Sequence, residues 1–163
     1  MSHHQSAEER LRPGESPAQR YDRNWQEILQ ELRVTQTGTQ ILTGFLLALA
    51  FQQRFQSLDA YGLVVYITLV GLASLATILC LAPVSLHRWL FRRHEKEELV
   101  LIGNRFVYWV LAVVALLIAG VVLFLFTFVV GFWAGIVGGA VAAIIMIALW
   151  LVLPWRTMRL GRE

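Results

Sequence analysis

Residues 106–155 read FVYWVLAVVALLIAGVVLFLFTFVVGFWAGIVGGAVAAIIMIALWLVLPW, a stretch of 50 residues without a charged side chain. As one helix it would measure about 75 Å, whereas the hydrocarbon core of a bilayer is about 30 Å thick. The stretch therefore has to fold back on itself. We expect the break near Gly131, because glycine tolerates a turn and the neighbouring Trp133 is typical of a membrane interface. The two resulting spans are predicted at 106–129 and 132–153.

Two shorter uncharged stretches precede it, at 34–53 and 60–87. Each is long enough for one transmembrane helix, which needs roughly 20 apolar residues. The composition is also typical of a membrane protein: 57% of the 163 residues are hydrophobic and only 15% are charged. Soluble domains carry about 25% charged residues. Prolines are expected to end the second span at Pro83 and the fourth at Pro154. The first two spans are predicted at 36–53 and 60–82.

The expected fold class is an all-α membrane protein, because a backbone in lipid must satisfy its own hydrogen bonds. Basic residues predict the orientation, since cytoplasmic segments carry the excess of Lys and Arg. Thirteen of the 14 lie in the N-terminal segment, the loop between the second and third spans, and the C-terminal tail. Arg54 alone lies on the opposite side, where Asp59 marks the outer edge of the second span. The sequence therefore predicts a four-transmembrane-helix bundle with both termini in the cytoplasm.

The N-terminal segment is polar. Residues 1–21 are poor in apolar side chains and are predicted to form a disordered cytoplasmic tail. Asp22 or Asn24 can cap the helix that follows. This helix is expected to be amphipathic, to lead into the first span, and to place on one side Trp25, Ile28, Leu29 and Leu32. The membrane domain is predicted at 22–155, followed by a basic cytoplasmic tail at 156–163.

A polar stripe runs from this helix into the first span. It consists of Arg33, Gln36, Thr37 and Gln40, whose spacing puts them broadly on one side of a helix. Polar side chains are costly against lipid, so we expect the last three to face neighbouring helices or a wet cavity. Hydrogen bonding between helices is the favoured interpretation, and a substrate path is the alternative.

The cytoplasmic loop predicted at 84–99 mixes aromatic and basic residues. We expect it to form a short interfacial helix that contacts lipid phosphates. The candidate headgroup contacts are Arg88, Arg92, Arg93 and Lys96. His87 and His94 lie seven residues apart, but a metal site needs further ligands that the sequence does not offer nearby. We therefore predict neither a metal nor a cofactor.

Small residues recur every four positions in the last span, at Gly131, Gly135, Gly139 and Ala143. This spacing produces a groove in which a second helix can approach closely. Packing within the bundle is favoured over homo-oligomerisation, because the four spans have to pack against one another.

Several residue types and motifs are missing from the sequence. No Asp, Glu or Lys lies within the four predicted spans, although ion-coupled carriers rely on ionisable side chains there. The sequence also lacks a P-loop, a zinc-protease helix, a haem-attachment motif and a nucleophile elbow. Its net charge of +3 comes from basic residues beside the spans, as the topology rule and anionic lipids require. We predict neither enzyme activity nor nucleic-acid binding.

Two segments carry a family resemblance: residues 28–42, ILQELRVTQTGTQIL, and residues 82–93, APVSLHRWLFRR. They resemble the signatures of an uncharacterised actinobacterial integral-membrane family, a domain of unknown function, over roughly 22–154. The resemblance implies four spans and a bacterial plasma-membrane location, and it supplies no catalytic residue. Members are sometimes labelled sodium:proton antiporters, a function that implies a titratable ion site.

Two functions are compatible with these features. The first is a small structural or accessory membrane protein that associates with lipid, with itself or with a larger membrane complex. The alternative is an oligomeric transporter or channel, resembling a sodium/proton antiporter, that uses the polar stripe of the first span. The first is favoured because the predicted spans lack carboxylates.

Overall fold

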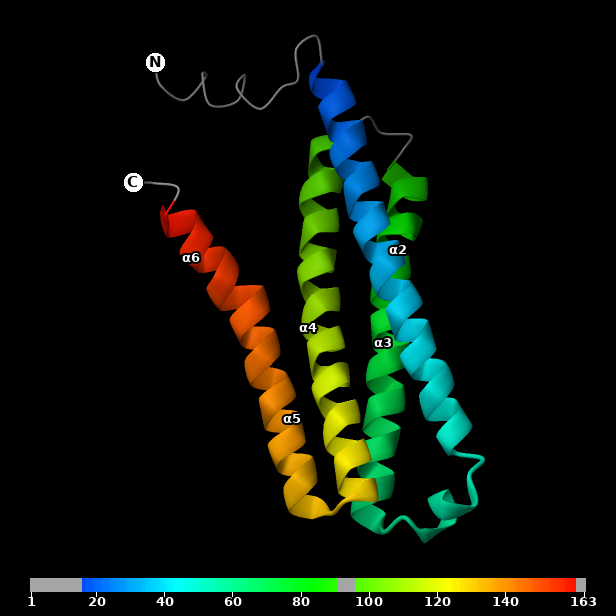
Figure 1. The fold of residues 1–163 in the computed structure, drawn as a ribbon. Coiled ribbons are helices and arrows are strands. Elements are labelled where there is room, and N and C mark those ends of the chain that lie inside the picture. The colour runs from blue at the N-terminus through cyan, green and yellow to red at the C-terminus, as the bar shows by residue number, and fades with distance from the viewer. Residues whose placement is uncertain (1–15, 91–95, 161–163) are drawn as a thin grey trace. The chain divides into compact units, whose positions relative to one another are not determined.

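The computed structural model describes residues 16–90 and 96–160. Within these ranges the regular elements are all helices, which confirms the all-α prediction (Figure 1). They are α2 (Pro17–Leu49), the 3₁₀-helix η1 (Gln53–Ser57), α3 (Ala60–Leu90), α4 (Lys96–Val129), α5 (Phe132–Ile147), the π-helical turn η2 (Ala148–Val152) and α6 (Leu153–Leu160).

Three helical segments are long and apolar enough to cross a membrane: Ala60–Leu86, Val100–Val129 and Phe132–Thr157. They contain the predicted second, third and fourth spans. Helix α2 is not among them, because charged residues occupy its first half and glutamines and threonines continue into its second. The predicted first span at 36–53 is also too long at its end, since α2 stops at Leu49 and residue 53 belongs to η1.

Helix α2 begins earlier than the sequence predicts. It starts at Pro17, whereas residues 17–21 were expected in a disordered tail and Asp22 or Asn24 at the cap. The cap is Ser16, whose Oγ accepts a hydrogen bond from the Gln19 amide at 3.3 Å. The Gln19 Oε1 in turn accepts one from the Ser16 amide at 2.8 Å. This reciprocal capping box, with proline in the first helical position, explains the earlier start. Residues 1–15 lie outside the described ranges.

Helix α3 does not end at Pro83. It continues to Leu90, so residues 84–90 extend the helix where a separate interfacial loop was predicted at 84–99. Proline removes the hydrogen bond that its amide would donate to the Leu79 carbonyl. In a membrane helix such a loss is tolerated because continuation of the helix satisfies the remaining backbone groups. Residues 91–95, which follow α3, lie outside the described ranges.

The expected break in the long apolar stretch is confirmed at the predicted place. Helix α4 ends at Val129, α5 begins at Phe132, and Gly131 adopts a φ of 134° that L side chains rarely take. Pro154, in contrast, does not end the last helix. The turn η2 precedes it, and there the Leu153 amide donates to the Ala148 carbonyl five residues back. This wider turn accommodates the proline ring, so the helix continues as α6 to Leu160 (Figure 1).

The chain divides into two compact units. The first comprises residues up to 37 together with 78–110, and the predicted apolar side of α2 is buried there through Trp25, Ile28 and Leu32. The Trp25 ring lies over Gly103 of α4, where a Cβ atom would approach it to 2.8 Å. The helices of this unit therefore approach closely because position 103 has no side chain.

The second unit comprises residues 38–77 and 111–163. Its core is a cluster of buried side chains from α2, α3 and α4: Leu46, Tyr66, Leu69, Ala73, Leu117, Val121 and Phe124. The Tyr66 hydroxyl donates a hydrogen bond of 3.1 Å to the Leu46 carbonyl. That carbonyl lies in the last turn of α2, where the Ala50 amide bonds to Leu47 instead. Tyr66 thus satisfies a helix-terminal acceptor inside the core.

We expect Tyr66→Phe to lower the free energy of unfolding by about 1–3 kcal/mol, because the buried Leu46 carbonyl loses its partner. Tyr61→Phe is the matched control, since that ring is half exposed. Denaturant unfolding in detergent, followed by circular dichroism, measures both. Equal stability of the two variants would contradict this role for the hydroxyl.

Candidate functional site

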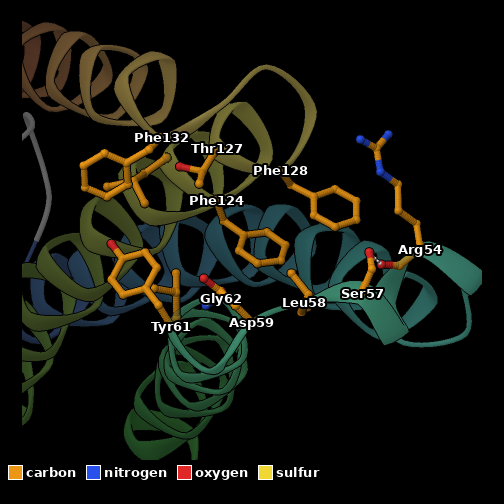
Figure 2. Close-up of a pocket in the computed structure, with 12 residues that line it drawn as sticks. Arg54, Ser57, Leu58, Asp59, Tyr61, Gly62, Phe124, Thr127, Phe128 and Phe132 are labelled. Atoms are coloured by element: carbon orange, nitrogen blue, oxygen red, sulfur yellow. Dashed lines mark hydrogen bonds between the residues drawn. The ribbon is translucent and has the colours of Figure 1, made fainter.

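A pocket of about 380 Å³ opens in the second unit, between the α2–α3 connection, the start of α3 and the end of α4 (Figure 2). It combines polar side chains with an aromatic floor. Its lining residues are Arg54, Ser57, Leu58, Asp59, Tyr61, Gly62, Val65, Leu123, Phe124, Thr127, Phe128 and Phe132.

Arg54 is held at one end of this pocket by the 3₁₀-helix η1. The next residue, Phe55, packs edge-on against the buried Tyr66 ring with centroids 4.8 Å apart, which anchors η1 to the core. The Ser57 hydroxyl donates a 2.7 Å hydrogen bond to the Arg54 carbonyl and closes the turn. The Arg54 guanidinium carbon then lies 5.0 Å from the centroid of the Phe128 ring, within range of a cation–π interaction.

Asp59 caps helix α3. Its Oδ1 accepts a hydrogen bond of 2.7 Å from the Gly62 amide, and its carbonyl accepts one from Leu63 at 3.0 Å. A carboxylate at a helix N-terminus is stabilised by the free amides and by the helix dipole. Asp59 therefore has a structural role before any ligand is considered.

Aromatic rings form the other end of the pocket. Tyr61 and Phe132 meet at 6.2 Å with their planes at 66°, so they join α3 to α5 (Figure 2). The Thr127 side chain lies between the two ends, on α4. The pocket thus combines a guanidinium, a helix-capping carboxylate and a few hydroxyls with aromatic carbon. This combination is suited to binding an amphiphilic molecule. In the part of the chain that the structure describes, no group of three or more His, Cys, Asp or Glu residues is placed to hold a metal ion.

The polar stripe of α2 lies elsewhere, and most of it is open among the residues that the structure describes. Arg33, Thr37 and Gln40 are exposed, and Gln36 is half-buried. The buried polar side chain is instead Thr39, which is 1% exposed. Gln36, Thr37 and Gln40 were expected to face neighbouring helices or a wet cavity, and within the described chain Thr37 and Gln40 are left open, so a neighbour for them stays a prediction.

The candidate headgroup contacts are only partly described. Arg88 lies in the last turn of α3 and Lys96 begins α4, while Arg92 and Arg93 fall outside the described residues. The two described positions therefore flank one short connection between helices.

The small residues of the last span divide into two groups. Gly135 and Gly139 are buried against α4, where a Cβ at Gly139 would lie 2.9 Å from the Leu123 Cβ. A Cβ at Gly135 would overlap the Thr127 hydroxyl and approach the Leu123 carbonyl to 2.7 Å. Ala143 is half-buried, and Gly131 forms the turn rather than the groove. The close contact is thus made within the chain.

A sequence profile described as a family of unknown function, DUF6328, matches residues 14–154. The chain belongs to this family. The match includes both segments that suggested a family of unknown function, and it extends from the capping box of α2 to Pro154. Neither the curated proteins nor the solved structures that were compared with this DUF6328 member gave a match.

The pocket of this DUF6328 member was not predicted as a site. One signal was visible in the sequence, since Arg54 is the single basic residue away from the other 13. Thr127 and Phe128 carried no such signal, because they lie in an apolar helix more than 60 residues away and meet Arg54 only through the fold.

We expect Gly135→Ala to destabilise the protein by about 1–3 kcal/mol, because the added methyl group overpacks the contact with α4. Gly71→Ala is the matched control: it also lies inside a helix, but a Cβ there meets nothing within 4 Å. Its higher helix propensity should stabilise by about 0.5–1 kcal/mol. Thermal unfolding in detergent distinguishes the two signs, and a neutral Gly135→Ala would refute the close contact.

Proposed function

We propose that the protein is a small structural or accessory protein of the bacterial plasma membrane, a four-transmembrane-helix bundle that associates through α2 with itself or with a larger membrane complex. Both termini lie in the cytoplasm in this proposal. The observation that carries it is the outward-facing polar stripe of α2.

The packing of α2 supports its role as the first of the four spans. Leu46 is fully buried in one cluster with Leu69 of α3 and Leu117 of α4, and both of these lie within apolar candidate spans. The second half of α2 therefore runs at the same depth as two helices that are apolar enough for the membrane. Residues 34–53 are also free of charge.

The distribution of charge supports the orientation. If only α3, α4 and α5–α6 crossed, the basic α3–α4 connection would be cytoplasmic and the N-terminal segment would lie outside with its five arginines. A crossing by α2 returns this segment to the cytoplasm, as the positive-inside rule favours.

The polar stripe then requires a partner. Gln40 lies nine residues before the end of α2, which is about 14 Å along the helix and near the middle of a bilayer. Thr37 already donates to the Arg33 carbonyl at 3.0 Å, so its hydroxyl is satisfied within the helix. The Gln40 amide is exposed, and an amide in hydrocarbon costs several kcal/mol unless it is hydrogen-bonded. A second membrane helix can supply that hydrogen bond.

The same stripe would also serve the alternative, an oligomeric transporter or channel. Its path would contain Arg33 and the Gln40 amide but no carboxylate, since the predicted spans contain no Asp or Glu. Proton- and sodium-coupled transport relies on ionisable groups within the membrane. The accessory function is therefore the better supported proposal.

Cysteine labelling tests the topology. In a Cys80→Ala background, Gln26→Cys, Gln56→Cys and Thr157→Cys are each exposed to a membrane-impermeant maleimide on intact cells. Four spans predict labelling of Gln56→Cys alone. Labelling of both Gln26→Cys and Gln56→Cys on intact cells would show that α2 does not cross. Permeabilised cells provide the control that all three sites react.

Gln40→Leu tests the role of the stripe. An interhelical hydrogen bond contributes about 0.6–2 kcal/mol, so its loss should weaken association by roughly 3- to 30-fold. Photobleaching step counts in lipid bilayers measure self-association, and crosslinked co-purification from native membranes measures binding to partners. Gln56→Leu, outside the spans, is the matched control. Unchanged association with both copies and partners would contradict the proposal. Sodium- or pH-driven flux in liposomes that Gln40→Leu abolishes would establish the transporter instead.

A further inference from the structure

A second hollow adjoins the pocket at Arg54. Its volume is about 280 Å³, and it is lined by Leu49, Gln52 and Phe55 together with Arg54, Phe124 and Phe128. The last three residues also line the first pocket. The guanidinium and the Phe128 ring therefore stand between a chamber with hydroxyl and carboxylate groups and a chamber of mostly aliphatic and aromatic carbon.

Arg54 is available to an anion. Its side chain is exposed and stacks on Phe128, and across residues 16–90 and 96–160 no carboxylate forms an ion pair with it. The nearby carboxylate, Asp59, is engaged by the Gly62 amide in capping α3. A guanidinium carries a planar fork of donors that matches two phosphate oxygens. The isolated position of Arg54, away from the other 13 basic residues, agrees with a dedicated contact.

We propose that this pair of hollows binds one anionic glycerophospholipid. The phosphate lies on the Arg54 guanidinium, the hydroxyl-bearing headgroup occupies the chamber with Ser57 and Thr127, and an acyl chain follows Phe124 and Phe128 into the apolar hollow. The negative headgroup is favoured because Arg54 supplies a positive charge and the N-terminus of α3 carries positive partial charge, while Asp59 accepts a hydrogen bond from the Gly62 amide. A free phosphate ion would leave the apolar chamber empty.

This site goes beyond the proposed function. It lies in the turns of the second unit, whereas self-association is assigned to the outer face of α2. It is also distinct from the basic residues that flank the α3–α4 connection. Lipid binding at Arg54 and association through Gln40 can therefore fail separately.

The test uses a photoreactive phosphatidylglycerol that bears a diazirine in its acyl chain, with a phosphatidylcholine analogue for comparison. The full-length protein is reconstituted in nanodiscs, irradiated and digested, and the labelled peptides are mapped by mass spectrometry. We expect phosphatidylglycerol to label the segments around residues 49–55 and 123–128. Arg54→Gln should lower this yield by about fivefold or more, as expected for the loss of a charge-assisted contact.

Two matched variants control the test. Arg105→Gln removes an exposed arginine of α4 in the other unit and should leave labelling at the pocket unchanged. Arg54→Lys keeps the charge without the fork and should give an intermediate yield. The Arg54→Gln variant is shown to be folded if it elutes as one species in size-exclusion chromatography and if its labelling outside the pocket is unchanged.

Three outcomes would overturn the proposal. The first is labelling of the pocket in the folded Arg54→Gln variant with the same yield as in the wild type. The second is equal labelling by the phosphatidylcholine analogue, which would remove the preference for negative charge. The third is suppression by millimolar inorganic phosphate, which would identify a site for the free ion rather than for lipid.

Discussion

A peptide group in hydrocarbon has no water with which to bond, and this constraint applies to the three helical segments that are long and apolar enough to cross a membrane. It explains why helices continue through both internal prolines. At Pro83, α3 runs on to Leu90, and at Pro154 the π-helical turn widens the hydrogen-bond spacing so that α6 can follow. The uncharged 50-residue stretch breaks at Gly131, where a positive φ returns the chain within two residues. Each deviation from a regular helix is thus confined to one turn.

The same constraint organises the polar side chains. Threonine hydroxyls return to carbonyls of their own helix, as Thr37 and Thr43 do, and the Tyr66 hydroxyl serves the open end of α2. Gln40 has a longer side chain that points away from its own chain's core. A local bond suffices for a hydroxyl, whereas an amide needs a donor and an acceptor from another helix. The proposed association follows from this difference in chemistry.

Much of the fold could be predicted from charge and length alone. The absence of charge at 106–155 predicted the two apolar helices and the break at Gly131, because bilayer thickness limits the length of a span. Helix ends were predicted less well where the sequence signal was proline, because a proline removes one backbone hydrogen bond without necessarily ending the helix. The start of α2 was missed because the Ser16–Gln19 capping box lies in a polar segment without hydrophobic periodicity. The pocket required the fold, because Arg54 and Phe128 are brought together only by the contact of η1 with the core.

The π-helical turn has a consequence for the last helix as a whole. An additional residue in one turn advances the downstream helix by about 100°, the rotation of one α-helical position. The face that carries Gly135 and Gly139 on α5 therefore does not continue in phase onto α6. Beyond η2, the Arg159 guanidinium carbon lies 3.8 Å from the centroid of the Trp155 ring. Because of the wider turn, Trp155 lies on a different side of the helix from Gly135 and Gly139. The helix thus consists of two segments, one packed on α4 through its glycines and one whose Trp155 and Arg159 side chains are exposed.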